Sequence, residues 1–167
     1  MDPQLVRYIP NFINQTKANE LCSILQAIIP WSIFPPSPKS RKVYMWNQFM
    51  ESSTDPNINK IFRKLIKGIK QLFNADVQGI FCNLYENGGD YCPYHKDRYN
   101  MNIYTLSLGA TQDFLIKPDG KGTKSQKYTL HSSDMYFMHD ALHQTHKHSI
   151  PKRKTCTDTR ISIVFFT

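Results

Sequence analysis

Closely paired cysteines are absent from this sequence of 167 residues. Its four cysteines, Cys22, Cys82, Cys92 and Cys156, form no C-x-x-C pair, which argues against a zinc ribbon. The chain also lacks a charged segment followed by an apolar one, as a secretion leader would have. We therefore expect an intracellular protein of the cytoplasm or nucleus, in a reducing compartment, and not a secreted one.

A long hydrophobic run is missing too. The longest apolar stretch, 24–34, is broken by Gln26, Pro30 and Ser32, whereas a membrane-spanning helix needs about 20 apolar residues in a row. Internal repeats and low-complexity segments are also absent. The sequence predicts one soluble, monomeric domain over residues 1–167, a length that buries a core without disulfides.

Acidic residues are scarce relative to basic ones. The 13 Asp and Glu against 21 Lys and Arg give a formal net charge of +8. An excess of positive charge favours an anionic partner such as nucleic acid. A solvated basic surface without a specific partner would have the same composition, so charge alone leaves both interpretations open.

Helical spacing indicates two helices in residues 1–76. After an extended lead-in at 8–12, Asn14 or Thr16 can cap a helix that Pro30 ends. Asp55 can cap a second helix with Pro56 in its first turn. This second helix has a basic face, expected to be solvated, and an apolar stripe. The stripe comprises Ile58, Ile61, Phe62, Leu65, Ile66, Ile69, Leu72 and Phe73.

Between the two helices, residues 30–50 combine four prolines with basic and aromatic side chains. Proline fits neither a helix interior nor a central strand, so we expect an ordered loop with a candidate strand at 43–46.

From residue 77 onward the apolar period changes to two. Turn sequences such as Asn87-Gly-Gly and Pro118-Asp-Gly-Lys-Gly separate the short runs. The fold class predicted is α+β and mainly β, with a core over 77–167 and helices on its N-terminal side. Strand count alone allows a sandwich, a barrel or a jelly roll. The predicted strands are 77–85, 102–109, 112–117, 126–131, 134–138, 145–149 and 160–166.

A metal-binding pattern stands within this β region. His95 and Asp97 are two residues apart, so on an extended segment their side chains project to the same face. The downstream sequence Thr145-His-Lys-His148 adds further imidazoles. Two His and one carboxylate on one face of a metal form the facial triad of non-haem Fe(II) oxygenases. Strand parity alone leaves both His146 and His148 open as the third ligand.

Four motifs in a fixed order resemble the AlkB-type branch of the Fe(II)/2-oxoglutarate-dependent dioxygenases, which are oxidative nucleic-acid demethylases. They are N-x-Y at 83–85, H-x-D at 95–97, H-S-I-P at 148–151 and R-I-S-I-V-F at 160–165. The resemblance implies a double-stranded β-helix, a jelly-roll variant with the metal at its mouth. It implies Fe(II), 2-oxoglutarate and O2 as cofactors, and His148 as the third ligand.

The remaining histidines have weaker assignments. His146 would be a neighbour of the site, while His139 and His143 either point into the mouth or lie in a surface loop, the interpretation we favour.

The resemblance makes Arg160 the anchor for the far carboxylate of 2-oxoglutarate. A guanidinium on an apolar strand needs a buried anion, and the alternative partner is Asp134 or Asp158.

The resemblance also implies that Asn83 and Tyr85 hydrogen-bond the carboxylates of 2-oxoglutarate. Without the resemblance, Tyr85 would be interpreted as an ordinary core residue.

The sequence departs from the family pattern at two positions. A second arginine is expected six residues after the first, where this chain has Phe166, and Ser162 replaces an asparagine. Contacts of a second arginine near the metal and substrate are therefore not expected from this strand.

Base recognition is predicted from an aromatic and basic composition. Trp31, Tyr44, Trp46 and Arg41 fall where the family has its nucleotide-recognition lid, within residues 1–76. Aromatic rings can stack on a flipped or single-stranded base, although packing in the core is the alternative reading.

Together these features predict a dioxygenase that oxidatively demethylates N-alkylated bases in DNA or RNA. Two alternatives remain. One is a 2-oxoglutarate-dependent hydroxylase of a protein or small molecule, and the other is a nucleic-acid-binding module without turnover.

Overall fold

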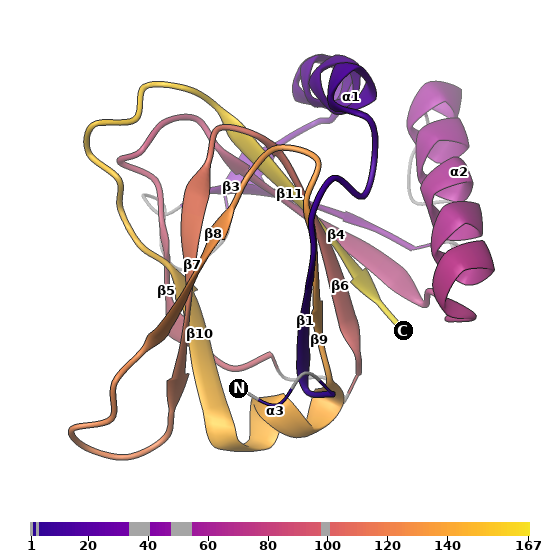
Figure 1. Ribbon diagram of the computed structural model, residues 1–167. Helices are drawn as coiled ribbons and strands as arrows, with labels where there is room; N and C mark the ends of the chain where they lie inside the picture. Colours follow the sequence, from indigo (N-terminus) through magenta and orange to yellow (C-terminus); the bar gives the residue numbers. More distant parts are fainter. Residues whose placement is uncertain (1, 3, 34–40, 48–54, 98–100) are drawn as a thin grey trace.

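Two facing antiparallel sheets form the body of the protein (Figure 1). The computed structural model describes residues 2, 4–33, 41–47, 55–97 and 101–167. The larger sheet has the order β1-β9-β6-β11-β4-β3-β2, and the smaller has the order β5-β10-β7-β8. The strands are β1 Val6–Ile9, β2 Ser32–Ile33, β3 Lys42–Trp46, β4 Gly79–Tyr85, β5 Cys92–His95, β6 Ile103–Gly109, β7 Gln112–Pro118, β8 Gln126–Leu130, β9 Met135–Met138, β10 His146–Ile150 and β11 Arg160–Phe166.

Two helices cover the outer face of the larger sheet, on the side away from the small sheet (Figure 1). The side chain of Asn14 caps α1 (Gln15–Ile28) by accepting from the backbone N of Thr16 at 2.8 Å. Asp55 caps α2 (Pro56–Phe73) by accepting from the backbone N of Asn57 at 2.7 Å. Because both caps are local, the sequence predicted them. No described helix is long and apolar enough to cross a membrane.

The apolar core lies in two layers. One cluster fills the space between the helices and the larger sheet, and includes Phe62 of α2 and Phe165 of β11. The other lies between the two sheets and includes Phe114 and Tyr136. The space between the sheets also holds buried polar side chains, among them Arg160 at 2% exposure. A site for a polar ligand is therefore expected between the sheets.

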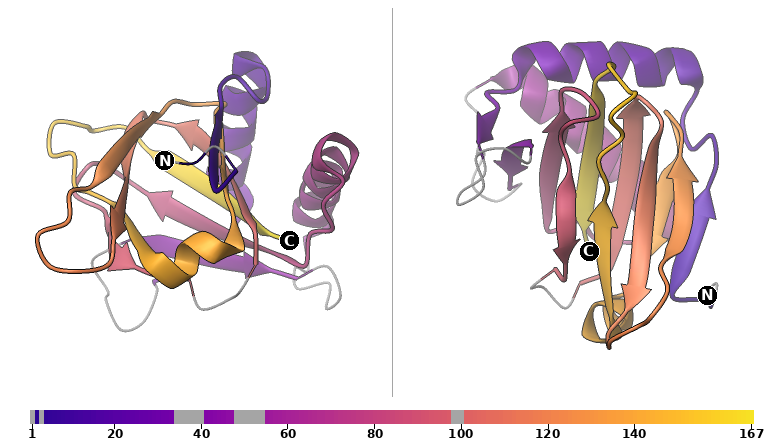
Figure 2. Two further views of the ribbon diagram at one scale, coloured as in Figure 1. Left: turned by 60° about the horizontal axis from the view of Figure 1, so that its bottom comes forward. Right: turned by 90° about the vertical axis from the view of Figure 1, so that its left-hand side faces the viewer.

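The predicted mainly β jelly roll with N-terminal helices is confirmed, with local corrections. The first strand begins at Val6 and not at Tyr8, and the helix α3 (Asp140–Thr145) was not predicted. Figure 2 shows α3 across one end of the space between the sheets. Leu72 is 65% exposed and lies off the packed stripe of α2, whereas Phe73 next to it packs against the core. The loop predicted at 30–50 includes β2 and β3, and its stretch 34–40 lies outside the described residues, as do 48–50.

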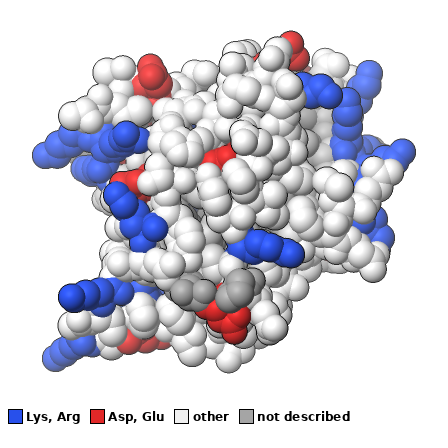
Figure 3. All heavy atoms as spheres, viewed as in Figure 1, with Lys and Arg blue, Asp and Glu red and all other residues white. Residues whose placement is uncertain are grey.

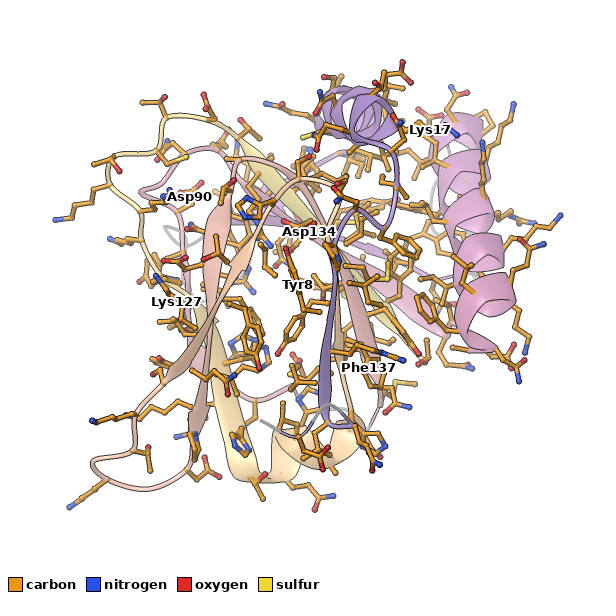
Figure 4. All side chains as sticks on the ribbon, viewed as in Figure 1. Tyr8, Lys17, Asp90, Lys127, Asp134 and Phe137 are labelled. Atoms are coloured by element: carbon orange, nitrogen blue, oxygen red, sulfur yellow. The ribbon has the colours of Figure 1, made fainter. Side chains whose placement is uncertain are left out.

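Hydrogen bonds to Asp134 hold the N-terminal segment around β1 against the larger sheet. Its buried carboxylate accepts hydrogen bonds from the Tyr8 hydroxyl and from the backbone N of Asn11 and His131, at 3.0 and 2.7 Å respectively. Figure 4 shows the labelled Tyr8 and Asp134 side chains pointing toward each other. Because these donors occupy its carboxylate, Asp134 does not serve as the anionic partner of Arg160.

Candidate metal centre

Two adjacent strands of the small sheet bring the proposed metal ligands together. The register of β5 against β10 pairs His95 with His148, and Asp97 follows β5 directly. One ligand atom from each of the three residues lies within 4.8 Å of the other two. The Asp97 carboxylate oxygens lie 3.6 Å from Nε2 of His95 and 3.5 Å from Nε2 of His148.

The environment of each ligand fixes its protonation. Nδ1 of His95 lies 2.9 Å from the carbonyl oxygen of Pro93, which can only accept, so Nδ1 carries a proton and donates it. This leaves Nε2 facing Asp97, and metal-binding histidines commonly donate their other ring N–H to a backbone carbonyl in this way. Burial lowers the pKa of His148 to about 3, so its imidazole is neutral and able to bind a metal.

His95 differs from His148 in its titration. Burial by itself lowers its pKa, but hydrogen bonds with the Asp97 carboxylate and the Cys92 thiol outweigh burial and raise the pKa to about 10. Burial works to raise the pKa of Asp97, and the surrounding imidazoles reverse that effect, so its pKa is lowered. At neutral pH without metal, His95 therefore carries one proton more than its metal-binding form, and Asp97 is its anionic partner.

We expect a divalent metal to displace this proton. Affinity for Mn(II) should rise roughly tenfold per pH unit between about pH 6 and 9, because His95 is protonated below its pKa of about 10 and must lose a proton to bind. Calorimetric titrations in buffers of different ionisation enthalpy would count the released proton. A pH-independent affinity with no proton release would contradict this assignment.

The other histidines of the C-terminal half differ in position. His143 of α3 was expected in a surface loop, but it is 5% exposed and its Nδ1 lies 3.9 Å from the Asp97 carboxylate. His146 is half-buried and its Nδ1 contacts the Thr145 hydroxyl at 2.9 Å. His139 accepts from the backbone N of Ala141 at 3.2 Å and caps α3. Only His148 joins His95 and Asp97 among the described residues.

A buried cation stands in the same cavity. Arg160 is 2% exposed, its Nε donates to the Ser107 hydroxyl at 3.1 Å, and its guanidinium carbon lies 5.2 Å from the Tyr85 ring centroid. Its Nη1 is buried without a hydrogen-bond partner. No carboxylate of the described chain forms an ion pair with it. An unpaired donor of this kind fits a carboxylate ligand that binds through two oxygens.

Asn83 and Tyr85 line the cavity from β4, as expected from their shared strand parity. The register places Tyr85 opposite Arg160 and Asn83 opposite Ser162. The Asn83 amide donates to the Ser162 hydroxyl at 3.1 Å and accepts from Nε of Arg41 at 2.5 Å. Burial raises the pKa of Tyr85 well above its usual range, so the phenol remains a hydrogen-bond donor.

The three aromatic side chains predicted to stack on a base pack against the helix-side cluster. Trp46 is 2% exposed, packs against Phe62 of α2 and donates to the Asn59 side chain at 2.8 Å. Tyr44 also faces Phe62, with its hydroxyl buried. Trp31 packs against the same helix-side cluster. Trp46 is therefore not free to stack on a base, a base contact of Trp31 and Tyr44 stays a prediction, and Arg41 lines the cavity.

The wall that the larger sheet gives to the cavity becomes apolar further along the strands that bear the polar groups. Phe166, in the place of a second arginine, lines the cavity together with Phe81, Val164 and Ile103. Sequence patterns missed Cys92, whose Sγ lies 3.4 Å from Nδ1 of His95, and the Ser107 contact with Arg160. The Ser107 contact depends on the pairing of β6 with β11, which no short motif connects, whereas Cys92 and His95 lie three residues apart on β5.

Comparison with known proteins places this geometry in context. Residues 36–165 match a family model described as the 2OG-Fe(II) oxygenase superfamily. A search of curated protein sequences found no match. The fold resembles the structure of OsALKBH1, with a TM-score of 0.68 and 14% identity over 97% of this chain and 96% of that one.

Two further solved structures share the fold. An oxidoreductase of the 2OG-Fe(II) oxygenase family from Burkholderia pseudomallei matches with a TM-score of 0.66 and 14% identity over 96% of this chain and 84% of that one. A prolyl-4-hydroxylase from Pseudomonas putida matches with a TM-score of 0.56 and 12% identity, over 96% of this chain and 91% of that one. At such identities the likeness shows the fold.

Proposed function

From the premise that this chain belongs to the 2OG-Fe(II) oxygenase superfamily, we propose that it oxidatively demethylates N-alkylated bases in DNA or RNA. The enzyme class itself follows from membership: a dioxygenase that uses Fe(II), 2-oxoglutarate and O2. The proposal concerns the residues that bind these groups and the substrate that is oxidised.

The observation that carries the site assignment is the convergence of three ligands and one unpaired guanidinium in a single cavity. We assign the metal to His95, Asp97 and His148, because two neutral imidazoles and a carboxylate suit Fe(II). We assign the far carboxylate of 2-oxoglutarate to Arg160 and Tyr85. Asn83 is placed two residues along the strand to donate to the other end of the molecule.

Within this assignment each side chain has one task. When bound, Fe(II) with 2-oxoglutarate and O2 supplies the oxidising power to hydroxylate a C–H bond, giving succinate and CO2. The buried imidazole of His148 and the anionic Asp97 remain in fixed protonation states, and the apolar wall excludes water from the cavity. An N-methyl carbon hydroxylated in this way loses formaldehyde and leaves the base with an N–H. This sequence requires no general base from the protein.

Charge on the outer face of the small sheet favours nucleic acid as the partner. Lys117 and Lys147 are register partners, so two like charges stand opposite each other, an arrangement that an anion would relieve. Lys117 also lies over the Tyr94 ring at 6.0 Å. Figure 3 shows lysine and arginine side chains along the side of the molecule that this sheet occupies. The small-sheet basic face comprises Lys117, Lys127 and Lys147 on the strands and Lys121 and Lys124 on the loop between β7 and β8.

We expect this face to govern the salt dependence of binding. The double variant Lys117→Gln and Lys147→Gln should bind single-stranded oligonucleotides more weakly, and the slope of log affinity against log salt should fall by about 1.4, since each phosphate contact on a single strand contributes about 0.7. The matched control changes Lys64 and Lys67 of α2 in the same way. Fluorescence anisotropy at several salt concentrations measures both. An equal loss in the two double variants would argue against a defined binding face.

The proposed activity is tested by product. Methylated single-stranded and double-stranded DNA and RNA oligonucleotides are incubated with the protein, Fe(II), 2-oxoglutarate and ascorbate, and mass spectrometry then detects the loss of methylene mass. Release of formaldehyde equal to the succinate formed would support demethylation. Succinate formed without any change in these oligonucleotides would contradict the nucleic-acid substrate.

A second candidate is hydroxylation of a protein side chain. The observation that favours it is Phe166, which makes the cavity wall apolar where the AlkB pattern has a cation. The fold likeness to the P. putida prolyl-4-hydroxylase is consistent with such a substrate. Peptide arrays assayed by the same mass spectrometry would show addition of one oxygen with no formaldehyde.

A further inference from the structure

Arg41 occupies an unexpected place in the cavity. It immediately precedes β3 and lines the same cavity as the metal ligands and Arg160. Its Nε donates to Oδ1 of Asn83 at 2.5 Å. Among the described residues, the cavity therefore has two guanidinium groups in its lining, one from β11 and one from the residue before β3, and the sequence motifs account only for the first.

The contact with Arg41 fixes the orientation of the Asn83 amide. A guanidinium has donors only, so the amide atom facing it must be the oxygen. The Asn83 nitrogen then donates to the Ser162 hydroxyl at 3.1 Å, and its second N–H remains for an acceptor. Arg41 and Asn83 together therefore form a cluster of donors, which suits an anionic oxygen ligand.

The two guanidinium groups lie at different register pairs of β4 and β11. Arg160 pairs with Tyr85, whereas the Asn83 contacted by Arg41 pairs with Ser162, two residues further along β11. Two residues of a strand span about 7 Å, comparable to the length of a five-carbon dicarboxylate. The spacing therefore matches one ligand with an anionic group at each end.

We propose that Arg41 binds the carboxylate next to the 2-oxo group of 2-oxoglutarate, while Arg160 binds the far carboxylate. This inference rests on the proposed site assignment and deepens it. It also explains how the chain compensates for Phe166: the second positive charge comes from the segment entering β3, because β11 provides none at its end. Arg41 was predicted from sequence to hold nucleic acid, and the structure supports a role in cosubstrate binding instead.

The test uses a pair of 2-oxo acids that differ at one end. The full chain loaded with Mn(II), without Fe(II), is titrated calorimetrically with 2-oxoglutarate and with 2-oxopentanoate, which lacks the far carboxylate. Arg41→Met should weaken binding of both acids by the same factor, about tenfold to a hundredfold for one charge-assisted contact. Arg160→Met should weaken 2-oxoglutarate alone. Mn(II) affinity without an acid should stay within about twofold in Arg41→Met.

A neighbouring lysine provides the matched control. Lys42 pairs with Glu86 on the surface at 2.7 Å, so Lys42→Met removes the same charge one residue away and should leave both affinities unchanged. Arg41→Lys keeps the charge but loses the planar fork. It should weaken both acids equally and less than Arg41→Met does, and it decides the question should Arg41→Met fail to fold.

The outcomes separate the inference from the site assignment. If the parent protein binds neither acid, the proposed site itself fails. If the parent binds 2-oxoglutarate but the Arg41 variants bind both acids normally, only the inference is overturned. Loss of 2-oxoglutarate alone in the Arg41 variants would also overturn it, because Arg41 would then share the far carboxylate with Arg160.

Discussion

Replacing His148 by alanine is expected to abolish turnover and to weaken Mn(II) binding by more than about a hundredfold. Loss of a mere outer-shell partner of a metal ligand already costs tenfold to a hundredfold in affinity, and His148 is one of only three proposed ligands. His95→Ala and Asp97→Ala should have effects of the same size. Electron paramagnetic resonance of free Mn(II) measures the affinity directly, without requiring a substrate.

His146→Ala is the matched control for this prediction. His146 is on the same strand, two residues before His148, but it is half-buried and hydrogen-bonded to Thr145 at 2.9 Å. Its removal should leave Mn(II) in place. If the variant without His148 bound Mn(II) as well as the parent did, the ligand assignment would be wrong.

Arg160→Met is expected to reduce the affinity for 2-oxoglutarate by about a hundredfold to several thousandfold. Leaving one member of a buried ion pair without its partner costs on the order of 3 to 5 kcal/mol, and each tenfold change corresponds to about 1.4 kcal/mol.

The substitution Arg160→Met should also leave the free energy of unfolding of the metal-free protein unchanged or raised. The reason is that Nη1 of Arg160 is buried without a partner there, and its desolvation opposes folding.

Two measurements check this pair of expectations. Calorimetry with Mn(II) present gives the affinity, and urea unfolding of the metal-free chain gives the stability. Arg153→Met serves as the control, since Arg153 is an exposed arginine that donates to the Thr111 carbonyl at 2.6 Å, on the loop between β10 and β11. Unchanged 2-oxoglutarate affinity in Arg160→Met would mean that Arg160 has a structural role only.

The helix caps and the strand periods were predictable because their causes are local. Asn14 and Asp55 cap helices through bonds to residues two positions away, and alternation of apolar residues over 160–166 requires no distant partner. The spacing of His95 and Asp97 belongs to the same class. Their side chains converge because of geometry within three residues, so sequence alone indicated a metal-binding pair.

The orientation of Tyr44 and Trp46 toward the helices has a different origin. Alternation tells which side chains of β3 share a face, but not which face meets the helices, and a shift of one residue exchanges the two. The pairing of β3 with β4 and the packing of α2 decide it: Tyr44 lies opposite Cys82 and Trp46 opposite Ile80, on the helix side. Arg41, three residues before Tyr44, lines the cavity between the sheets.

The sequence by itself determined the fold class, the helix caps and the metal-binding residue types, because short-range geometry and the order of motifs specify them. Only the tertiary structure decided which side chains surround the cluster of His95, Asp97 and His148 and line the cavity beside it. It buried His143 beside Asp97 and brought Arg41 to Asn83 across 42 positions of sequence. Such contacts arise from strand register and layer packing, in which each residue depends on partners far away in the chain.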